Sequence, residues 1–274
     1  MGSIKYQRSN TGFTLIELLV VTAVLAILVG LLLPALGKAK SKAYCINEIN
    51  AAKQMMLAHR MYADDYESRL LPGYRYNHHA SNRVGKSIDH PINARYPWRL
   101  APYLAHNFEI LYANKNLALL HSFSRGNEDE YTYAASVFPS MGINSVFVGG
   151  DDMVLSPNRN AFQKFGRFCV LKEAEVKRPS QLFAFSSARS VFEDKIAEGF
   201  YRVEPPYLTK RLWSKHWSAD LDPQEFGFVH PRFGNKAVSA MLDGHAEVLS
   251  VTEMQDMRHW SNLADKPDWI LKEQ

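Results

Sequence analysis

The first strong pattern in the chain is an apolar run that follows a short polar leader. Residues 1–12 are mostly polar and end in Gly12, and apolar residues then continue to Leu36 with Glu17 as the only charge. From Leu18 the run has about 19 residues, close to the roughly 20 that span a bilayer core. It therefore predicts a membrane-spanning helix with a carboxylate near its start.

Three other interpretations of the run fit less well. A secretory signal peptide has an apolar core of about 7–15 residues followed by its cleavage site, whereas here the candidate cleavage site precedes the run. The run is too uniformly apolar for a helix of a soluble protein, which normally carries a polar face. A plain signal anchor explains the length but not Glu17, because a carboxylate at the centre of a membrane helix costs about 2.5–3.5 kcal/mol. We therefore expect a group outside the chain to satisfy Glu17.

A helical pattern continues beyond the apolar run. From Lys38 to about Tyr66 the chain has no Gly or Pro, and apolar side chains recur at helical spacing. The expected buried stripe consists of Cys45, Ile49, Ala52, Met55, Met56, Ala58, Tyr62, Ala63 and Tyr66, interrupted by His59, with Lys53, Arg60 and Asp64 on the opposite face. The pattern predicts one helix over residues 14–67, with its first half in lipid or a filament core. Its second half should pack on a globular body, and the break comes near residues 71–73.

The rest of the chain predicts an α+β body, in which the long helix packs on an antiparallel sheet. Residues 72–274 are enough for one good core or two small lobes. The clearest element is a hairpin of residues 237–242 and 245–249, because Asp243-Gly244 between alternating segments favours a tight turn. The other expected elements are helices within residues 96–104 and 107–120, and strands over residues 131–137, 144–148, 170–176 and 182–185.

The junction between the leader and the apolar run resembles a known processing site. It reads Gly12-Phe13-Thr14-Leu15-Ile16-Glu17-Leu18-Leu19-Val20-Val21 and is similar to the site of type IV prepilins and type II secretion pseudopilins. The resemblance implies cleavage after Gly12 by prepilin peptidase and methylation of the new amine of Phe13. It also implies that Glu17 pairs with the Phe13 amine of a neighbouring subunit in a growing filament. A buried carboxylate is tolerable once it meets such a cation.

The resemblance also bears on the helix itself and on its orientation. Pro34 lies where many pilins carry a helix-kinking proline, and proline removes one helical hydrogen bond. Charge does not decide the orientation, because two basic residues precede the run and three lysines follow it closely. The resemblance implies a single-pass protein of the inner membrane, with a cytoplasmic leader and a periplasmic body. The expected segments are a leader (1–12), an assembly segment (13–37), an extramembrane helix (38–71) and the body (72–274).

The second half of the helix and the hairpin narrow the resemblance to one subgroup. Residues 45–49 and 61–66 resemble large sets of prepilin-like proteins of planctomycetes, verrucomicrobia and lentisphaerae. Their C-terminal domain is named for a histidine, nine residues and Asp-Gly, the H-X9-DG pattern. Asp243-Gly244 matches the second part of that pattern, but Phe233 stands where the histidine is expected. The resemblance therefore implies the fold. It does not extend to any role of that histidine, because this chain has Phe233 at the position.

Composition and charge exclude some partners. The net charge of +4 falls by two when the basic residues of the leader are removed, and the remaining charge is scattered. The three lysines that follow the apolar run suit lipid headgroups better than nucleic acid. We therefore expect the lipid bilayer, prepilin peptidase and other pilin-like subunits as partners, and no nucleic acid. Cys45 and Cys169 either form one disulfide in an oxidising compartment or remain free, with Cys45 buried on the helix.

Candidate metal ligands are few, and no spacing identifies them. His230, Asp243 and His245 either meet in a small metal site near the hairpin, or Asp243 serves only the turn. Calcium, which the resemblance to type II pseudopilins suggests, would need oxygen ligands such as Asp151, Asp152 and Asp243. We expect no cofactor, and calcium is the alternative.

Catalytic motifs are not evident in the sequence. It contains no Gly-x-Ser-x-Gly, no His-Glu-x-x-His and no phosphate-binding loop, so we expect a protein that is not an enzyme, and a hydrolase is the least favoured function. His78-His79 is either a metal-binding pair or an exposed loop. An aromatic cluster either stacks on carbohydrate or covers a core; its members are Trp213, Trp217, Phe226 and Phe228.

Two functions remain after these exclusions. The first is a structural pilin-like subunit that assembles through its N-terminal helix into a pilus or a type II secretion-like pseudopilus. The second is a membrane-anchored surface module that uses the same export signal and binds a ligand such as a polysaccharide. The two share every N-terminal feature and differ in the body, where a groove favours binding and a compact sheet favours assembly.

Overall fold

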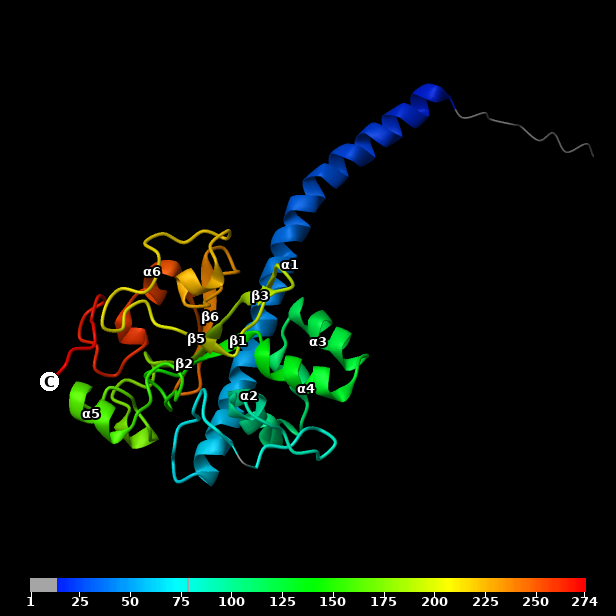
Figure 1. Ribbon diagram of the computed structural model, residues 1–274. Coiled ribbons are helices and arrows are strands. Elements are labelled where there is room, and N and C mark those ends of the chain that lie inside the picture. Colours follow the sequence, from blue (N-terminus) through cyan, green and yellow to red (C-terminus); the bar gives the residue numbers. More distant parts are fainter. Residues whose placement is uncertain (1–13, 78) are drawn as a thin grey trace, which may run out of the picture. The chain divides into compact units, whose positions relative to one another are not determined.

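The computed structural model describes residues 14–77 and 79–274 (Figure 1). Gly12, Phe13 and His78 lie outside the described residues. The chain divides into two compact units, Met1–Ala43 and Tyr44–Gln274, and the long helix α1 (Leu15–Asp65) belongs to both. The second unit contains a mixed sheet with helices on its two faces, so the predicted α+β class is confirmed.

In the second unit, α1 buries the apolar stripe that its sequence predicts. The buried residues of α1 are Glu48, Ala51, Ala52, Met55, Met56, Ala58, His59, Tyr62 and Ala63. Lys53, Arg60 and Asp64 are exposed on the opposite face, as expected. The prediction was wrong for Tyr66, whose side chain is 50% exposed, because α1 ends at Asp65.

The sheet of the body has the strand order β5-β1-β2-β6-β7. Its strands are β1 (Met141–Asn144), β2 (Phe183–Ser187), β5 (Arg202–Val203), β6 (Lys236–Met241) and β7 (Ala246–Ser250). All neighbours are antiparallel except β1 and β5, which are parallel. A separate hairpin pairs β3 (Ser190–Phe192) with β4 (Lys195–Ala197). The sheet is therefore mixed, with one short parallel edge.

Two hydrophobic clusters cover the two faces of this sheet. One contains the buried stripe of α1 together with Phe185 of β2, and the other contains Phe183 of β2 with Trp260. Residues two apart in a strand normally share one face. The register between β2 and β6 shifts between Phe183 and Phe185, and this bulge explains why the two rings point to opposite faces.

Short helices pack around the sheet (Figure 1). The α1 face carries α2 (Tyr96–Leu100), α3 (Asn116–Ser124) and α4 (Glu128–Val137), and the other face carries α6 (Val251–Met254). The remaining helix is α5 (Arg159–Phe165), and the 3-10 turns are Ile92–Ala94, Ala101–Leu104, Phe108–Leu111, Glu173–Glu175, Pro223–Phe226 and Met257–His259. The predicted short helix within residues 96–104 is confirmed as α2 and the turn that follows it.

The strand predicted over residues 131–137 is wrong, because this segment belongs to helix α4. The side chain of Asn127 accepts a hydrogen bond from the N–H of Glu130 at 2.8 Å and caps the helix. Acidic residues occupy the whole first turn, where they complement the helix dipole. These N-terminal signals outweigh the alternating pattern of Tyr131-Thr132-Tyr133.

Three other predicted elements differ from the structure. Residues 107–120 form a 3-10 turn and then α3, with Asn114 at a positive φ of 60° between them. The strand expected over residues 144–148 lies earlier, as β1. Residues 170–176 contain isolated bridges and a 3-10 turn instead of a strand.

The hairpin predicted around Asp243-Gly244 is confirmed as β6 and β7. Five residue pairs join the two strands, from Lys236 with Ser250 to Ala240 with Ala246. Gly244 has a φ of 97°, a conformation that glycine adopts without steric cost. The strand predicted over residues 182–185 corresponds to β2.

A buried carboxylate on α1 joins the helix to the sheet. Glu48 is 0% exposed, and its Oε1 accepts a hydrogen bond of 2.5 Å from Ser187 Oγ on β2. Its Oε2 lies 3.6 Å from Nη1 of Arg232, and Asn114 Nδ2 approaches the same oxygen at 3.5 Å. Burial raises the pKa of Glu48, although the attraction of Arg232 opposes that change.

Arg232 is held in place from several directions. Its Nη2 donates to the carbonyl oxygens of Ser140 and Ala188 at 3.0 and 2.6 Å, and its Nη1 donates to the carbonyl of Glu198 at 3.0 Å. The guanidinium group therefore connects β1, β2 and the β4 region beside the carboxylate of Glu48. A cation this deep needs such partners, because an unpaired buried charge is strongly unfavourable.

We expect Glu48→Ala to lower the free energy of unfolding by about 3–5 kcal/mol, because it removes the fully buried carboxylate beside Arg232 and leaves only the longer contact of Arg232 with Glu198 at 3.9 Å. Glu48→Gln should lower it less, because the amide oxygen still accepts from Ser187. The measurement is urea unfolding of the full chain in micelles, followed by tryptophan fluorescence. Lys53→Ala, on the exposed face of the same helix, is the control and should stay within about 0.5 kcal/mol of the wild type. Equal effects of Glu48→Ala and Lys53→Ala would contradict the role of Glu48.

The buried side chain of His59 makes the stability of the fold depend on pH. Burial lowers the pKa of His59 to about 4, and its Nε2 accepts a hydrogen bond from the N–H of Leu71 at 3.4 Å. A histidine with a lowered pKa stabilises the fold above its unfolded pKa and loses that contribution as the pH falls. Between pH 7.5 and 5.0 the wild type should therefore lose about 2 kcal/mol more than His59→Gln. Identical pH dependence of the two proteins in urea unfolding would show that His59 is not a neutral buried group.

Candidate functional site

The first turn of α1 closes on itself through Thr14 and Glu17. The backbone N–H and the Oγ1 of Thr14 donate to Oε2 of Glu17 at 2.8 and 2.7 Å. The N–H of Glu17 donates to Thr14 Oγ1 at 3.2 Å. This is a reciprocal capping box, and it corrects the expectation that only a group outside the chain satisfies Glu17. The Thr-x-x-Glu spacing is the signal in the sequence that could have revealed it.

This arrangement places a carboxylate at the positive end of a long helix dipole. The bonds that the structure describes converge on Oε2 of Glu17 and hold the side chain against the first turn. Negative charge is favourable at a helix N-terminus. Glu17 is therefore fixed in the first turn of α1, four residues along the sequence from Phe13, the residue that a cut after Gly12 would make N-terminal.

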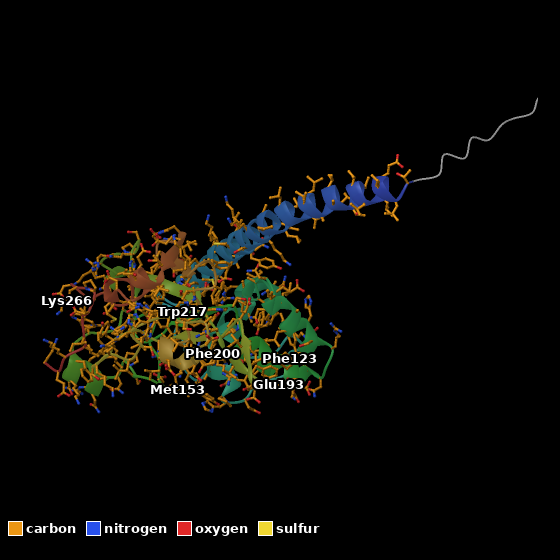
Figure 2. The ribbon with its side chains drawn as sticks, turned by 90° about the horizontal axis from the view of Figure 1, so that it is seen from above. Phe123, Met153, Glu193, Phe200, Trp217 and Lys266 are labelled. Carbon is orange, nitrogen blue, oxygen red and sulfur yellow. The ribbon has the colours of Figure 1, made fainter. Side chains whose placement is uncertain are left out.

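The apolar side chains on both sides of Glu17 in the sequence are exposed in the first unit. Leu15 is 79% exposed and Leu31 is 72% exposed, and Figure 2 shows the side chains standing out around the ribbon of α1. By length and composition α1 can cross a membrane, and its most apolar 18-residue window is 0% buried against the described chain. An apolar surface of this extent requires lipid or other helices to cover it. The helix is continuous through Pro34.

The hairpin turn uses the side chain of Asp243 for its own geometry. Asp243 Oδ1 accepts from the backbone N–H of His245 at 3.1 Å and lies 2.6 Å from its Nδ1. Burial raises the pKa of Asp243, but the hydrogen bonds from His245 outweigh that effect and hold it below its ordinary value. The two side chains thus form one local pair within the turn.

His230 does not join this pair. Its N–H donates to the carbonyl of Ser187 at 2.9 Å, near the start of β6, whereas Asp243 follows the end of β6. The strand Lys236–Met241 separates the two ends by about 17 Å at ~3.3 Å per residue. The structure therefore does not bring together the three proposed ligands of the hairpin site.

The proposed calcium ligands are also committed elsewhere. Asp151 is 0% exposed, and its oxygens accept from Ser145 Oγ at 2.5 Å and from the N–H groups of Met153 and Val154 at 2.8 and 3.1 Å. Asp152 forms an ion pair of 3.2 Å with Arg75. In residues 14–77 and 79–274, no group of three or more His, Cys, Asp and Glu side chains is arranged to hold a metal ion. His79 is described, but its predicted partner His78 lies outside the described residues.

Cys45 and Cys169 are free thiols in the structure. Cys45 packs at the edge of the cluster that contains α1, and Cys169 is buried in the cluster on the other face of the sheet. Burial raises the pKa of both thiols. Of the two alternatives that the sequence leaves open, the structure has the free thiols. Phe233, at the position of the missing motif histidine, packs against the α1 cluster.

The aromatic cluster, for which the sequence left open carbohydrate stacking or a role in the core, belongs mainly to the core. Trp213 is 3% exposed and Phe226 is 0% exposed, and their rings lie 4.1 Å apart. The ring of Trp217, labelled in Figure 2, is partly buried beside Phe226, and Arg189 covers it at 4.4 Å. Phe228 packs on Phe200 at 4.4 Å. These rings therefore stabilise the body and do not form an open platform.

Two important residues were missed at the level of sequence. Glu48 falls inside the apolar stripe of α1, between Cys45 and Ala52, and a carboxylate at such a position signals a buried partner. Its partner Arg232 is distant in the chain, and nothing near Arg232 in the sequence indicates the pairing. The sequence pattern thus locates one half of the ion pair only.

Comparison with known proteins finds a match for one part of the chain, its N-terminal segment. A family model described as "Prokaryotic N-terminal methylation motif" matches residues 7–33. The match contains Gly12, Phe13 and Glu17 and covers only the start of the chain. No curated protein and no solved structure matches the chain. The chain thus carries a prepilin-type N-terminal motif on an apolar helix, which fits a membrane-anchored prepilin-like protein, and the H-X9-DG resemblance stays a prediction.

Proposed function

We propose that this protein is a structural pilin-like subunit. Prepilin peptidase cleaves it after Gly12, and the new amine of Phe13 is methylated. Residues 13–37 anchor it in the inner membrane with the body on the periplasmic side. It then joins a pilus or a type II secretion-like pseudopilus through α1, where Glu17 meets the Phe13 amine of a neighbouring subunit.

One observation carries this proposal: Glu17 is held at the N-terminus of a helix whose apolar surface is uncovered. The capping box with Thr14 fixes the carboxylate, and the helix around it exposes large apolar side chains. Lipid covers that surface while the subunit is in the membrane, and neighbouring helices cover it in a filament. In a filament core the carboxylate gains a cation, which makes its burial tolerable.

A second candidate function is a membrane-anchored module that binds a ligand such as a polysaccharide. The aromatic cluster around Trp213 does not favour it, because those rings are in the core. A separate cavity of about 290 Å³, lined by tyrosines and arginines at the end of α1, is the observation that favours it. The two functions are compatible, because assembly uses the first unit and this cavity belongs to the second.

The first test of the proposed function is mass spectrometry of the chain purified from a host that has prepilin peptidase. We expect a mature chain that begins at Phe13 and carries one extra methyl group on its amine. Gly12→Leu should block cleavage, because a bulky residue replaces the glycine that precedes the cut. An intact leader on the wild-type chain would contradict the proposal.

The second test is filament assembly by Glu17→Ala. The variant should insert in the membrane and be cleaved, but the yield of sheared filaments should fall by at least about tenfold, because a charge-assisted contact between subunits is lost. Filament yield is measured by immunoblot of the sheared fraction against the membrane fraction. Normal yield from Glu17→Ala would contradict the pairing role.

Two matched variants separate that role from the capping box. Glu17→Gln keeps an acceptor for Thr14, since glutamine also serves in capping boxes, but removes the charge. Thr14→Val removes the cap and keeps the charge. If pairing with an amine is the role of Glu17, Glu17→Gln should assemble poorly and Thr14→Val should assemble well. The reverse result would assign the effect to capping of α1.

A further inference from the structure

A cavity of about 290 Å³ lies in the body where α1 ends. Its wall is formed by the last turn of α1, the segments 69–72 and 75–81 without residue 78, and the helical segment 98–106, together with Gly149 and Leu171. This volume is close to the lower end of the range for small-molecule sites, about 300–1,000 Å³. The cavity thus suits a ligand the size of one sugar ring.

Aromatic rings form one side of this cavity. Tyr62 and Tyr66 stack with centroids 4.4 Å apart and an interplanar angle of 19°, and Tyr103 meets Tyr62 edge-on at 6.1 Å. Tyr103 is fixed by a hydrogen bond of 2.8 Å from its hydroxyl group to Asp65 Oδ2. Tyr66 and Tyr76 are each about half exposed. The wall therefore offers the half-exposed ring of Tyr66, which is held by its stack on Tyr62.

Arginines form the other side, and one of them is buried without a carboxylate partner in the described chain. Arg99 is 8% exposed, and its guanidinium group donates to the carbonyl oxygens of Ala94 and Arg75. Burial lowers the pKa of Arg99 to about 10; the charge of Arg75 acts in the same direction, and Tyr62 and Asp152 act in the opposite one. A buried cation is stabilised when an anion lies beside it.

The other charges around the cavity leave it positive. Arg69 and Arg75 also line it, so with Arg99 it has three arginines. Two carboxylates lie outside the lining: Asp152, which pairs with Arg75 at 3.2 Å, and Asp65, which accepts from Tyr103. The described lining residues include no Asp or Glu. His79, His106 and Asn77 add side chains that can hydrogen-bond to hydroxyl groups. The cavity thus combines positive charge, polar groups and aromatic faces.

We propose that this cavity binds a sugar ring that carries an acidic group, as in an anionic polysaccharide. The acidic group lies beside Arg99 and supplies the missing anion, and the planar guanidinium fork matches a carboxylate or a sulfate. The apolar face of the sugar ring packs on the exposed tyrosine rings. The remaining hydroxyl groups bond to the polar side chains of the wall.

A larger cavity on the body differs in its charge. It has a volume of about 410 Å³ and lies between α3 and the β3–β4 hairpin. Lys115 and Lys195 line it together with Glu193 and Glu198, so its charges balance, and Lys115 is already paired with Glu198 at 3.6 Å. Of these two cavities in the described part of the chain, the one at the end of α1 therefore has the charge and the open aromatic rings that an acidic sugar requires.

The experiment is isothermal titration of the full chain in micelles of a detergent whose head group contains no sugar. The probes are trigalacturonate, galactose 6-sulfate, neutral galactotriose and sodium sulfate. At least one of the two acidic saccharides should bind, and the neutral saccharide and inorganic sulfate should bind at least about tenfold more weakly, because each lacks one half of the recognised group. Which acidic saccharide binds identifies the acidic group. Binding should weaken as salt is raised.

Matched variants test whether the saccharide binds in this cavity. Arg99→Gln should weaken binding by about tenfold or more, and Tyr66→Ala by about threefold to tenfold. Arg60→Gln and Tyr133→Ala are controls, because both residues are exposed and lie outside the cavity lining. Tyr66 is half exposed at the helix end, so Tyr66→Ala tests the site even if the buried Arg99→Gln fails to fold.

Several results would overturn the proposal. These are no binding of either acidic saccharide, equal binding of galactotriose, equal binding of inorganic sulfate, or an unchanged affinity in Tyr66→Ala. Filament assembly of Tyr66→Ala is measured in parallel. Normal assembly with lost binding shows that the cavity acts independently of the structural role, and absent binding in a wild type that assembles rejects the cavity alone.

Discussion

The fold of the body depends on the burial of one carboxylate, that of Glu48 on α1. This side chain contacts Ser187 on β2, Arg232 before β6 and Asn114 before α3, so three distant parts of the chain meet at one point of the helix. Hydrophobic packing alone allows a helix to slide or rotate on a sheet with little penalty, whereas a buried ion pair with directed hydrogen bonds permits one register. The helix therefore has a defined position on the sheet.

The two carboxylates of α1 show how one helix serves two environments. Glu48 is enclosed, and its partners all come from the same chain. Glu17 is capped by Thr14 and lies on a part of the helix whose apolar surface is exposed, so it stays accessible to a cation from elsewhere. Glu48 thus fixes the fold of a subunit, whereas Glu17, in the function we propose, joins subunits. The difference lies only in what surrounds each of them.

The sequence predicted those elements whose signals are local. The hairpin follows from Asp243-Gly244, and the buried stripe of α1 follows from apolar spacing. Residues 131–137 were predicted wrongly as a strand, because the cap at Asn127 and the acidic first turn favour a helix there. The strand expected after Asn144 and the Glu48–Arg232 pair depend on contacts between distant segments, which periodicity does not contain. In the candidate site, the Gly12-Phe13 junction and Glu17 were recognisable from the sequence. The proposed hairpin ligands His230, Asp243 and His245 are near each other in the sequence, but the structure does not bring all three together.

The cavity at the end of α1 depends on where the helix stops. Where α1 ends, Glu67 and Ser68 adopt positive φ angles of 55° and 60° and turn the chain sharply, and Tyr66, just past the helix, is left 50% exposed. The segment that carries Arg75 then folds beside Arg99 and brings two arginines together, with Asp152 as the counter-ion of only one. A body whose sole task was to be carried on a filament would gain stability by burying the ring of Tyr66 and replacing Arg99 with an apolar residue. Retaining an open, positive, aromatic cavity at this point is understandable if a ligand supplies the missing anion.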